Sequence, residues 1–316
     1  MDFGLPAGPA PSVAKQWIAR CERLSSDFVA LRERSRAIES VADVQRTDYS
    51  PVVATLVTLH AHPDDEAISC GGTIAKAVAE GHRVVLVVAT KGENGEVVEG
   101  FLRPGESLAE RRAKEQEEAC RILGIARLEW LDYVDSGMMG TPQNDAPESF
   151  WSADVEAAAA RLAAILEDEN ADILTHYDPA GTYGHPDHIQ CHRVGLRAAE
   201  LAGTARLYES VVNRDNIKEN LSRLSEEELL RVQEGGLDPA ELDELGVSAS
   251  EITTAVDVRD HLGLKRSAMA AHASQIADTS FFLAMPPQLF EQSFGTEWFI
   301  RRAAGERTET SLFEGI

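Results

Sequence analysis

Two short loops, far apart in the chain, carry the side chains best able to do chemistry. Residues 60–66 read HAHPDDE and residues 184–188 read GHPDH. Imidazole and carboxylate groups suit zinc, and they also suit iron or manganese. Each loop follows an apolar run typical of a buried strand, and open α/β sheets bind ligands at the carboxyl ends of their strands. We therefore expect the two loops to form the halves of one metal site.

Three residues of these loops are the candidate ligands. A catalytic zinc usually keeps three protein ligands and one open position. His62 and Asp65 lie three residues apart across a proline turn, so one loop can supply both of them, and His188 can come from the second loop. The expected cofactor is Zn²⁺, with Fe²⁺ or another divalent ion as the alternative.

The neighbouring polar residues suggest acid–base roles. Asp64 lies between the first two ligands and is free to take a proton from water activated by the ion. His185, as an imidazolium, is placed to steady an oxyanion or to protonate a leaving amine. Asp187 is expected to hold the His185 ring in orientation.

Other interpretations of the same residues stay open. An acid at the start of a helix often serves only to cap the first-turn amides, so either loop alone is weak evidence. His188 and His192 stand at positions i and i+4 and could chelate together from one helix, although no Glu stands at the general-base position of such motifs.

The elements that must hold these loops alternate along the chain. We expect strands at 52–60, 83–89, 128–131, 171–177, 205–212 and 253–258, and helices at 67–80, 107–123, 155–167, 188–201 and 261–277. This alternation with short turns predicts an α/β fold with a doubly wound, mainly parallel sheet and helices on both faces. Ser107 and Glu110 form a capping box for the second helix.

Two segments lie outside this rhythm. Residues 1–50 are expected to form a loose arm and a helix over 13–42, and residues 51–316 to form the main domain. An acidic helical insert at about 216–251 interrupts the alternation. It is either a solvated excursion or a lid beside the site.

Composition restricts the class of partner. Thirty basic and 53 acidic residues give a net charge of −23, which argues against binding nucleic acid or an anionic membrane through a broad charged face. No apolar run approaches the ~20 residues that span a bilayer, and the first residues do not resemble a secretory signal. The four cysteines have no paired spacing, which favours free thiols and a cytoplasmic setting.

Taken together, the two loops resemble the LmbE-like, or PIG-L, family of zinc N-deacetylases. The resemblance runs over about residues 52–302 and is supported by residues 92–96, by Arg112 with Glu115, and by residues 135–138. Residues 265–275 resemble the mycothiol branch of the family in particular. The resemblance implies a Rossmann-like fold and hydrolysis of an N-acyl group, often acetyl on glucosamine.

The resemblance also implies roles for single residues. Carried over by position, the zinc ligands are His62, Asp65 and His188, the general base is Asp64, the residue that stabilises the tetrahedral intermediate is His185, and the residue that orients it is Asp187. Tyr183 falls near the oxyanion, and Arg112 and Asp135 fall where sugar hydroxyls bind.

The leading functional hypothesis is therefore zinc-dependent hydrolysis of an N-acyl amide on a small, amino-sugar-like substrate. One alternative is an amidase that uses the same machinery on a thiol conjugate or a secondary-metabolite amide. A second alternative is a metal-binding or sugar-binding module without catalysis. Such a module is expected to lack the base or the oxyanion partner, whereas Asp64 and His185 are both present.

Overall fold

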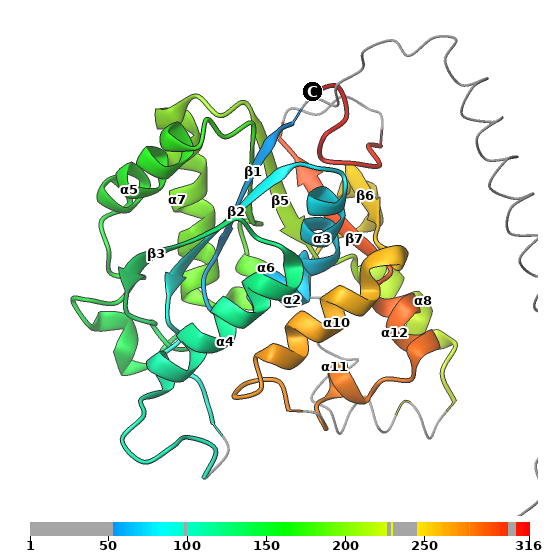
Figure 1. The fold of residues 1–316 in the computed structure, drawn as a ribbon, viewed down its shortest axis with the longest axis horizontal. Coiled ribbons are helices and arrows are strands. Elements are labelled where there is room, and N and C mark those ends of the chain that lie inside the picture. The colour runs from blue at the N-terminus through cyan, green and yellow to red at the C-terminus, as the bar shows by residue number, and fades with distance from the viewer. Residues whose placement is uncertain (1–52, 98–99, 226–228, 230–244, 278, 303–307) are drawn as a thin grey trace, which may run out of the picture. The chain divides into compact units, whose positions relative to one another are not determined.

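A seven-stranded sheet organises the part of the chain that the structure describes (Figure 1). The computed structural model describes residues 53–97, 100–225, 229, 245–277, 279–302 and 308–316. The strands are β1 (Thr55–His60), β2 (Arg83–Thr90), β3 (Arg127–Tyr133), β4 (Ile173–Tyr177), β5 (Arg206–Val211), β6 (Thr254–Asp257) and β7 (Thr296–Arg301). Their order in the sheet is β3-β2-β1-β4-β5-β7-β6. Strands β1 to β5 pair in parallel, and β7 is antiparallel to both β5 and β6.

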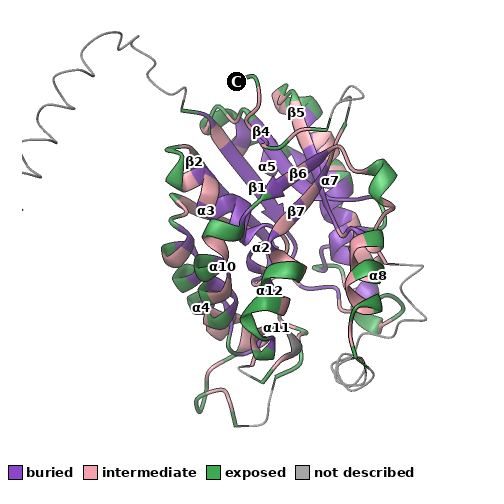
Figure 2. Cartoon of the chain, turned by 90° about the vertical axis from the view of Figure 1, so that its right-hand side faces the viewer, coloured by how far each residue is buried: buried purple, intermediate pink, exposed green. Residues whose placement is uncertain are grey.

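Helices cover both faces of this sheet (Figures 1 and 2). They are α2 (Asp65–Ser69), α3 (Gly71–Ala79), α4 (Leu108–Leu123), α5 (Val155–Asp168), α6 (Gly181–Gly184), α7 (Pro186–Ala202), α8 (Arg214–Ser222), α10 (Leu262–Ala271), α11 (Phe281–Ala284) and α12 (Pro287–Phe294). Helices α5 and α7 pack together on one face, and α3, α4 and α10 pack on the other. The predicted fold is therefore confirmed.

Successive side chains of a strand point to opposite faces of the sheet, and this alternation explains the two core layers. Leu56 of β1 and Val84 of β2 point into the core shared with α3, α10 and α12. Their successors Val57 and Val85 point into the core shared with α5 and α7. Because both faces are covered, the inner strands are apolar at nearly every position, as is usual for parallel sheets.

The order in which the strands are added to the sheet reverses between β1 and β4. From β1 the chain passes outward through β2 to β3, and it then returns to pair β4 with the other edge of β1. The loops that follow β1 and β4 consequently diverge to opposite faces and leave a crevice where ligands bind in folds of this class. Both loops that were singled out in the sequence lie at this switch point.

Several local expectations need correction. The single helix predicted over 67–80 is two helices, α2 and α3, broken at Cys70, whose backbone leaves the helical region at φ −140°. The helix predicted over 261–277 ends as α10 at Ala271. Strand β7 is not among the strands expected from the sequence, because its neighbours in the sheet, β5 and β6, are distant in sequence.

Other expectations agree with the structure or lie outside it. The capping box at Ser107 and Glu110 is present, and α4 stops at Gly124, which has φ 75°. The predicted arm and helix of residues 1–50 lie outside the described residues, as does half of the acidic insert. Its described helical parts are α8 and a 3₁₀ turn, Ala249–Glu251.

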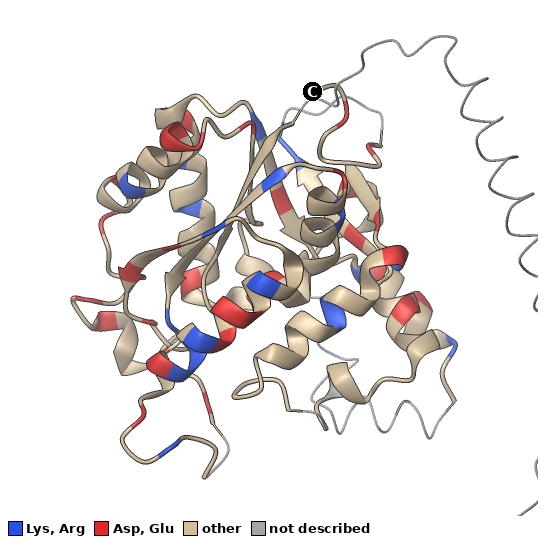
Figure 3. Ribbon diagram, in the orientation of Figure 1, with Lys and Arg blue, Asp and Glu red and all other residues tan. Residues whose placement is uncertain are grey.

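The described residues also show how charges and cysteines are distributed. Basic and acidic residues both lie along α4 (Figure 3). No described helix is both long and apolar enough to cross a bilayer. Of the described cysteines, Cys70, Cys120 and Cys191 are free and buried.

Candidate active site

The loop after β1 and the start of α7 bring the three predicted ligands together. Asp65 Oδ2 lies 3.4 Å from His62 Nδ1 and 3.4 Å from His188 Nε2. In a tetrahedral zinc site with bonds of ~2.0–2.1 Å, neighbouring ligand atoms are about 3.4 Å apart. The spacing therefore fits a small divalent cation, and the donor set of two imidazoles and one carboxylate is typical of one.

Unpartnered nitrogens also favour a cation here. Both ring nitrogens of His188 are buried without a hydrogen-bond partner, although buried polar groups are normally paired. The ring of His62 has its Nε2 engaged at 3.1 Å by the Asp187 carboxylate. Burial lowers the pKa of His62, but the surrounding carboxylates outweigh it and raise the pKa well above its usual value. The site thus holds an excess of negative charge that a cation would balance.

Asp64 lies beside this cluster in a strained conformation. Its φ of 107° and ψ of −28° lie in a region that side chains other than glycine rarely adopt. Although it is the N-cap of α2, its side chain makes no capping hydrogen bond, so capping does not account for the acid. Burial raises the pKa of Asp64 to about 6, although Arg112 acts to lower it. The carboxyl is poised to exchange a proton near neutral pH.

The side chain of Glu66 stabilises the strained turn at Asp64. The backbone N–H of Asp64 donates to Glu66 Oε2 at 3.2 Å. Glu66 is fully buried, and its other oxygen lies 3.0 Å from His272 Nε2. His272 has no acidic neighbour in sequence, but the fold places the Glu66 carboxylate beside its ring.

His185 differs from its predicted state. Burial, together with the His62 and His188 rings, lowers the pKa of His185 to about 4, so the ring is neutral at pH 7. Its Nδ1 caps α7 by accepting the backbone N–H of Asp187 at 3.1 Å. The proton of the neutral ring consequently sits on Nε2.

The orienting role expected of Asp187 also changes. Its carboxylate accepts from the backbone N–H of Ser136 at 2.9 Å, from the Ser136 hydroxyl and from His62 Nε2. Asp187 therefore fixes the ring of a candidate ligand, His62, while its backbone fixes His185. The reason is geometric, because capping α7 turns the His185 Nδ1 toward a backbone amide rather than toward a side chain.

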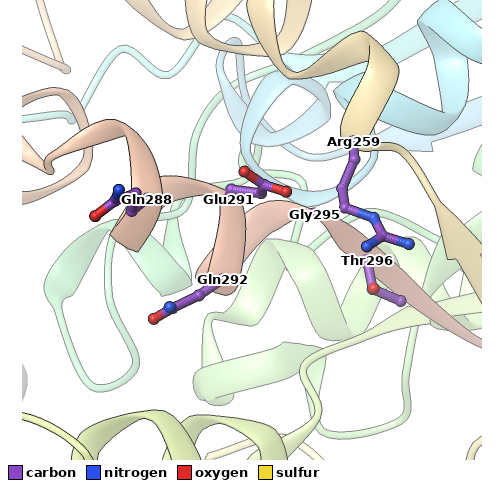
Figure 4. Close-up of a pocket in the computed structure, with 6 residues that line it drawn as sticks. All are labelled: Arg259, Gln288, Glu291, Gln292, Gly295 and Thr296. Atoms are coloured by element: carbon purple, nitrogen blue, oxygen red, sulfur yellow. The ribbon is translucent and has the colours of Figure 1, made fainter.

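A cavity of about 600 Å³ opens beside these residues. Asp64, Asp65 and His188 form part of its lining. A second, more open cavity of about 420 Å³ is lined by Arg259, Gln288, Glu291, Gln292, Gly295 and Thr296 (Figure 4). None of the predicted site residues lines the second cavity, so the first is the candidate substrate site.

Comparison with known proteins agrees with this arrangement. Residues 57–199, which include both loops, match the PIG-L family, described as GlcNAc-PI de-N-acetylase. A 1D-myo-inositol 2-acetamido-2-deoxy-α-D-glucopyranoside deacetylase of Thermomonospora curvata is 38% identical over 293 residues, covering 83% of this chain and 96% of that protein. The enzyme of the same name from Nocardiopsis dassonvillei is 39% identical over 287 residues, covering 82% and 99%. This chain belongs to the PIG-L family.

A solved structure supports the fold of this PIG-L chain. The N,N′-diacetylchitobiose deacetylase of Pyrococcus horikoshii aligns with a TM-score of 0.50 and 24% identity, covering 85% of this chain and 91% of that one. At this identity the likeness concerns the fold alone.

Arg112 and Asp135, the two residues predicted to bind sugar hydroxyls, both lie beside the loop that follows β1. Arg112 is buried, and its guanidinium donates to Pro63 O at 2.6 Å and Gly92 O at 3.0 Å, and lies 3.4 Å from Asp64 Oδ2. These contacts brace the loop in this PIG-L chain. Asp135 Oδ1 accepts the N–H of Gly137 at 2.7 Å and lies 3.7 Å from His62 Nε2.

Tyr183 lies at the mouth of the site. Its side chain is 52% exposed, and its ring centroid is 5.0 Å from that of His188 and 6.1 Å from that of His185. The preceding Thr182 has φ 65°, and Asp178 holds this turn by accepting the N–H of Thr182 at 3.1 Å. Tyr183 thus lies beside the rings of His185 and His188, and no hydrogen bond joins its hydroxyl to another residue in the described part of the chain.

The structure also clarifies two points that sequence left open or missed. His192 Nδ1 bonds to Tyr177 O at 2.9 Å, and the clusters of possible ligands among the described residues join His188 with His62 and His185 rather than with His192. Ser136, which holds Asp187, was not singled out. Its place in the family-like stretch 135–138 was the available signal.

Proposed function

We propose that this chain is a metal-dependent amidohydrolase that removes an N-acyl group from an amino-sugar-like amine. The observation that carries the proposal is that the Asp65 carboxylate lies 3.4 Å from a ring nitrogen of both His62 and His188, beside the strained carboxyl of Asp64. The names of the relatives give further support, since they refer to deacetylation of a 2-acetamido sugar. The substrate is then a small molecule, and the three free, buried cysteines agree with a cytoplasmic setting.

In this proposal the cation is Zn²⁺, held by His62, Asp65 and His188, with Fe²⁺ or another divalent ion as the alternative. When bound, such an ion acts as a Lewis acid on the acyl carbonyl and makes water a nucleophile near neutral pH. Asp187 supports this function indirectly by fixing the ring of His62.

The protein's own residues handle the protons and the developing charge. Asp64 takes a proton from the attacking water as the new C–O bond forms. The Nε2–H of His185 and the Tyr183 hydroxyl donate to the oxyanion. The C–N bond then breaks, the amine leaves with a proton, and the acyl group leaves as a carboxylate, so that one water is consumed. Arg112 and Asp135 border the side on which the sugar lies.

A mass-shift screen of N-acyl amines with the metal-loaded protein tests the proposal directly. We expect one acyl group to be lost from N-acylated amino sugars, and no turnover after chelation until metal is restored. If the metal-loaded protein hydrolyses no amide in such a screen, the hydrolase proposal is wrong and only the alternative of a non-catalytic binding module remains.

Asp64→Asn tests the assigned base. We expect kcat to fall by ~10²–10⁴ while the metal content stays that of the wild type, because only proton transfer is removed. Asp132→Asn is a matched control, since Asp132 also has a positive φ, 55°, but is exposed and paired with Lys91. Equal activity in the two variants would remove Asp64 from its role.

A further inference from the structure

The cavity beside the site is much larger than an acetyl group requires. Its volume is about 600 Å³, within the range of ~300–1,000 Å³ usual for whole small-molecule ligands. The methyl of an acetyl group is comparable in size with one water molecule, about 30 Å³. An acetyl substrate would therefore leave most of this space to water.

The walls of the cavity away from Asp64 and His188 are largely apolar. Ile217 and Leu221 project from α8, and Phe282 and Leu289 come from α11 and α12. All four side chains are only half-buried, so each keeps apolar surface open to the cavity. Such surface favours an apolar occupant, because covering it removes it from water.

The cavity opens on one side of the candidate ligands. Asp64, Asp65, Tyr183 and His188 line it, whereas His185, Asp135 and Arg112 do not. His185 and Asp135 belong instead to a cluster with His62 and Asp187, in which Asp135 faces Nε2 of His62 while Asp65 faces its Nδ1. If the sugar and its nitrogen lie toward His185 and Asp135, the cavity lies on the side of the acyl group.

We infer that the substrate carries a medium-length, apolar N-acyl chain, which occupies the cavity between α8 and α12. The inference rests on the proposed function and specifies its substrate class. The reaction remains the addition of one water across the acyl C–N bond, and the products are an apolar carboxylate and a free amine. The half-buried side chains of Ile217, Leu221, Phe282 and Leu289 then determine the preferred chain length.

Two matched substrate series test this assignment. The first keeps the amine, a methyl glucosaminide, and varies the acyl group through N-acetyl, N-butyryl, N-hexanoyl and N-octanoyl. The second keeps N-acetyl and lengthens the alkyl glycoside from methyl to octyl. We expect kcat/KM to rise about fourfold per buried methylene in the first series and to stay nearly constant in the second. A rise confined to the glycoside series would overturn the inference, since the cavity would then hold the amine side.

A filling substitution locates the chain. In Leu221→Trp we expect the ratio of kcat/KM for N-octanoyl over N-acetyl substrate to fall at least tenfold. Leu201→Trp is the matched control, because Leu201 is an exposed leucine near the end of another helix, α7, and does not line the cavity. The control should keep the wild-type ratio. An unchanged ratio in Leu221→Trp would exclude the chain from this cavity.

Binding of the product acids separates this inference from the proposed function. Calorimetry with the metal-loaded protein should find octanoate bound more tightly than acetate in the wild type, with the difference lost in Leu221→Trp. If N-acetyl substrates are hydrolysed but longer acyl chains are not, the hydrolase proposal stands and the inference is wrong. If octanoate binds as expected but no amide of either series is hydrolysed, the hydrolase proposal fails and the apolar preference of the cavity stands.

Discussion

Two buried groups of possible metal ligands lie near each other in this chain, and they are built differently. The catalytic cluster, defined as His62, Asp65, His185 and His188, lies at the switch point of the sheet. The buttress cluster, defined as His176, His192 and Glu209, joins β4, α7 and β5. Its ligating atoms lie within 4.8 Å of one another, as do those of His62, His185 and His188 in the first cluster. By residue type alone, both clusters could hold an ion.

Their hydrogen bonds separate them. In the buttress cluster, Nδ1 of His176 and Nδ1 of His192 bond to the same carbonyl, Tyr177 O, at 2.7 and 2.9 Å, and Arg302 donates to Glu209. Nε2 of His176 is also buried without a partner, but none of the three buttress residues lines either of the two cavities described above. In the catalytic cluster, both nitrogens of His188 lack a partner and the residue lines a cavity. The difference teaches that ligand type is a weak criterion for a metal site, and that unpartnered donors facing an accessible space are a stronger one.

Two histidines on α7 give the largest test of this comparison. His188→Ala should lose its metal, and turnover should fall by about a thousandfold or more, because a Lewis-acid contribution of several kcal/mol disappears. His192→Ala, one helical turn later, should keep wild-type metal content and most of its turnover. Elemental analysis and amide hydrolysis measure both variants, with thermal unfolding to establish that each is folded. Metal loss in His192→Ala, or full occupancy in His188→Ala, would reverse the assignment.

A smaller effect, on metal affinity, is expected from Ser136, which supports the catalytic cluster through Asp187. Ser136→Ala removes the hydroxyl that donates to Asp187 while the backbone N–H of residue 136 remains. Partners of this kind typically contribute 10–100-fold to metal affinity, and we expect about tenfold here because one donor is kept. Competition with a chelator of known affinity measures the change.

Ser149→Ala is the matched control for that prediction. Ser149 is also fully buried, in the same connecting segment, but its hydroxyl donates to Asn144 O. Its removal should leave metal affinity unchanged. If both variants lose affinity equally, the effect is one of general packing and Asp187 has no special support from Ser136.

The sequence predicted the parallel strands of the sheet and the proximity of His62, Asp65 and His188, for identifiable reasons. Strands buried on both faces, such as β2, read as continuous apolar runs, and both loops carry their ligands within a few residues. It predicted the bounds and the capping box of α4, but not that charged Arg112 and Glu115 lie on its buried side. Their partners, including Ser274 for Glu115, are remote in sequence. The protonation of His185 and the true partner of Asp187 likewise depend on contacts between distant segments.

The smallest expected effect concerns the buttress cluster, which should respond in stability rather than in catalysis. Arg302→Met leaves the Glu209 carboxylate, 4% exposed, without its cationic partner. We expect the free energy of unfolding in urea to fall by about 1–3 kcal/mol, because a buried acceptor loses its donor. Burial already raises the pKa of Glu209 against the effect of Arg302, so the variant should recover stability when the pH is lowered and the carboxyl takes up a proton.

Combining Arg302→Met with Glu209→Gln should recover part of the loss at pH 7, since a neutral amide needs no counter-charge. Metal content should not change in either protein; its loss would mean that the two clusters act as one site.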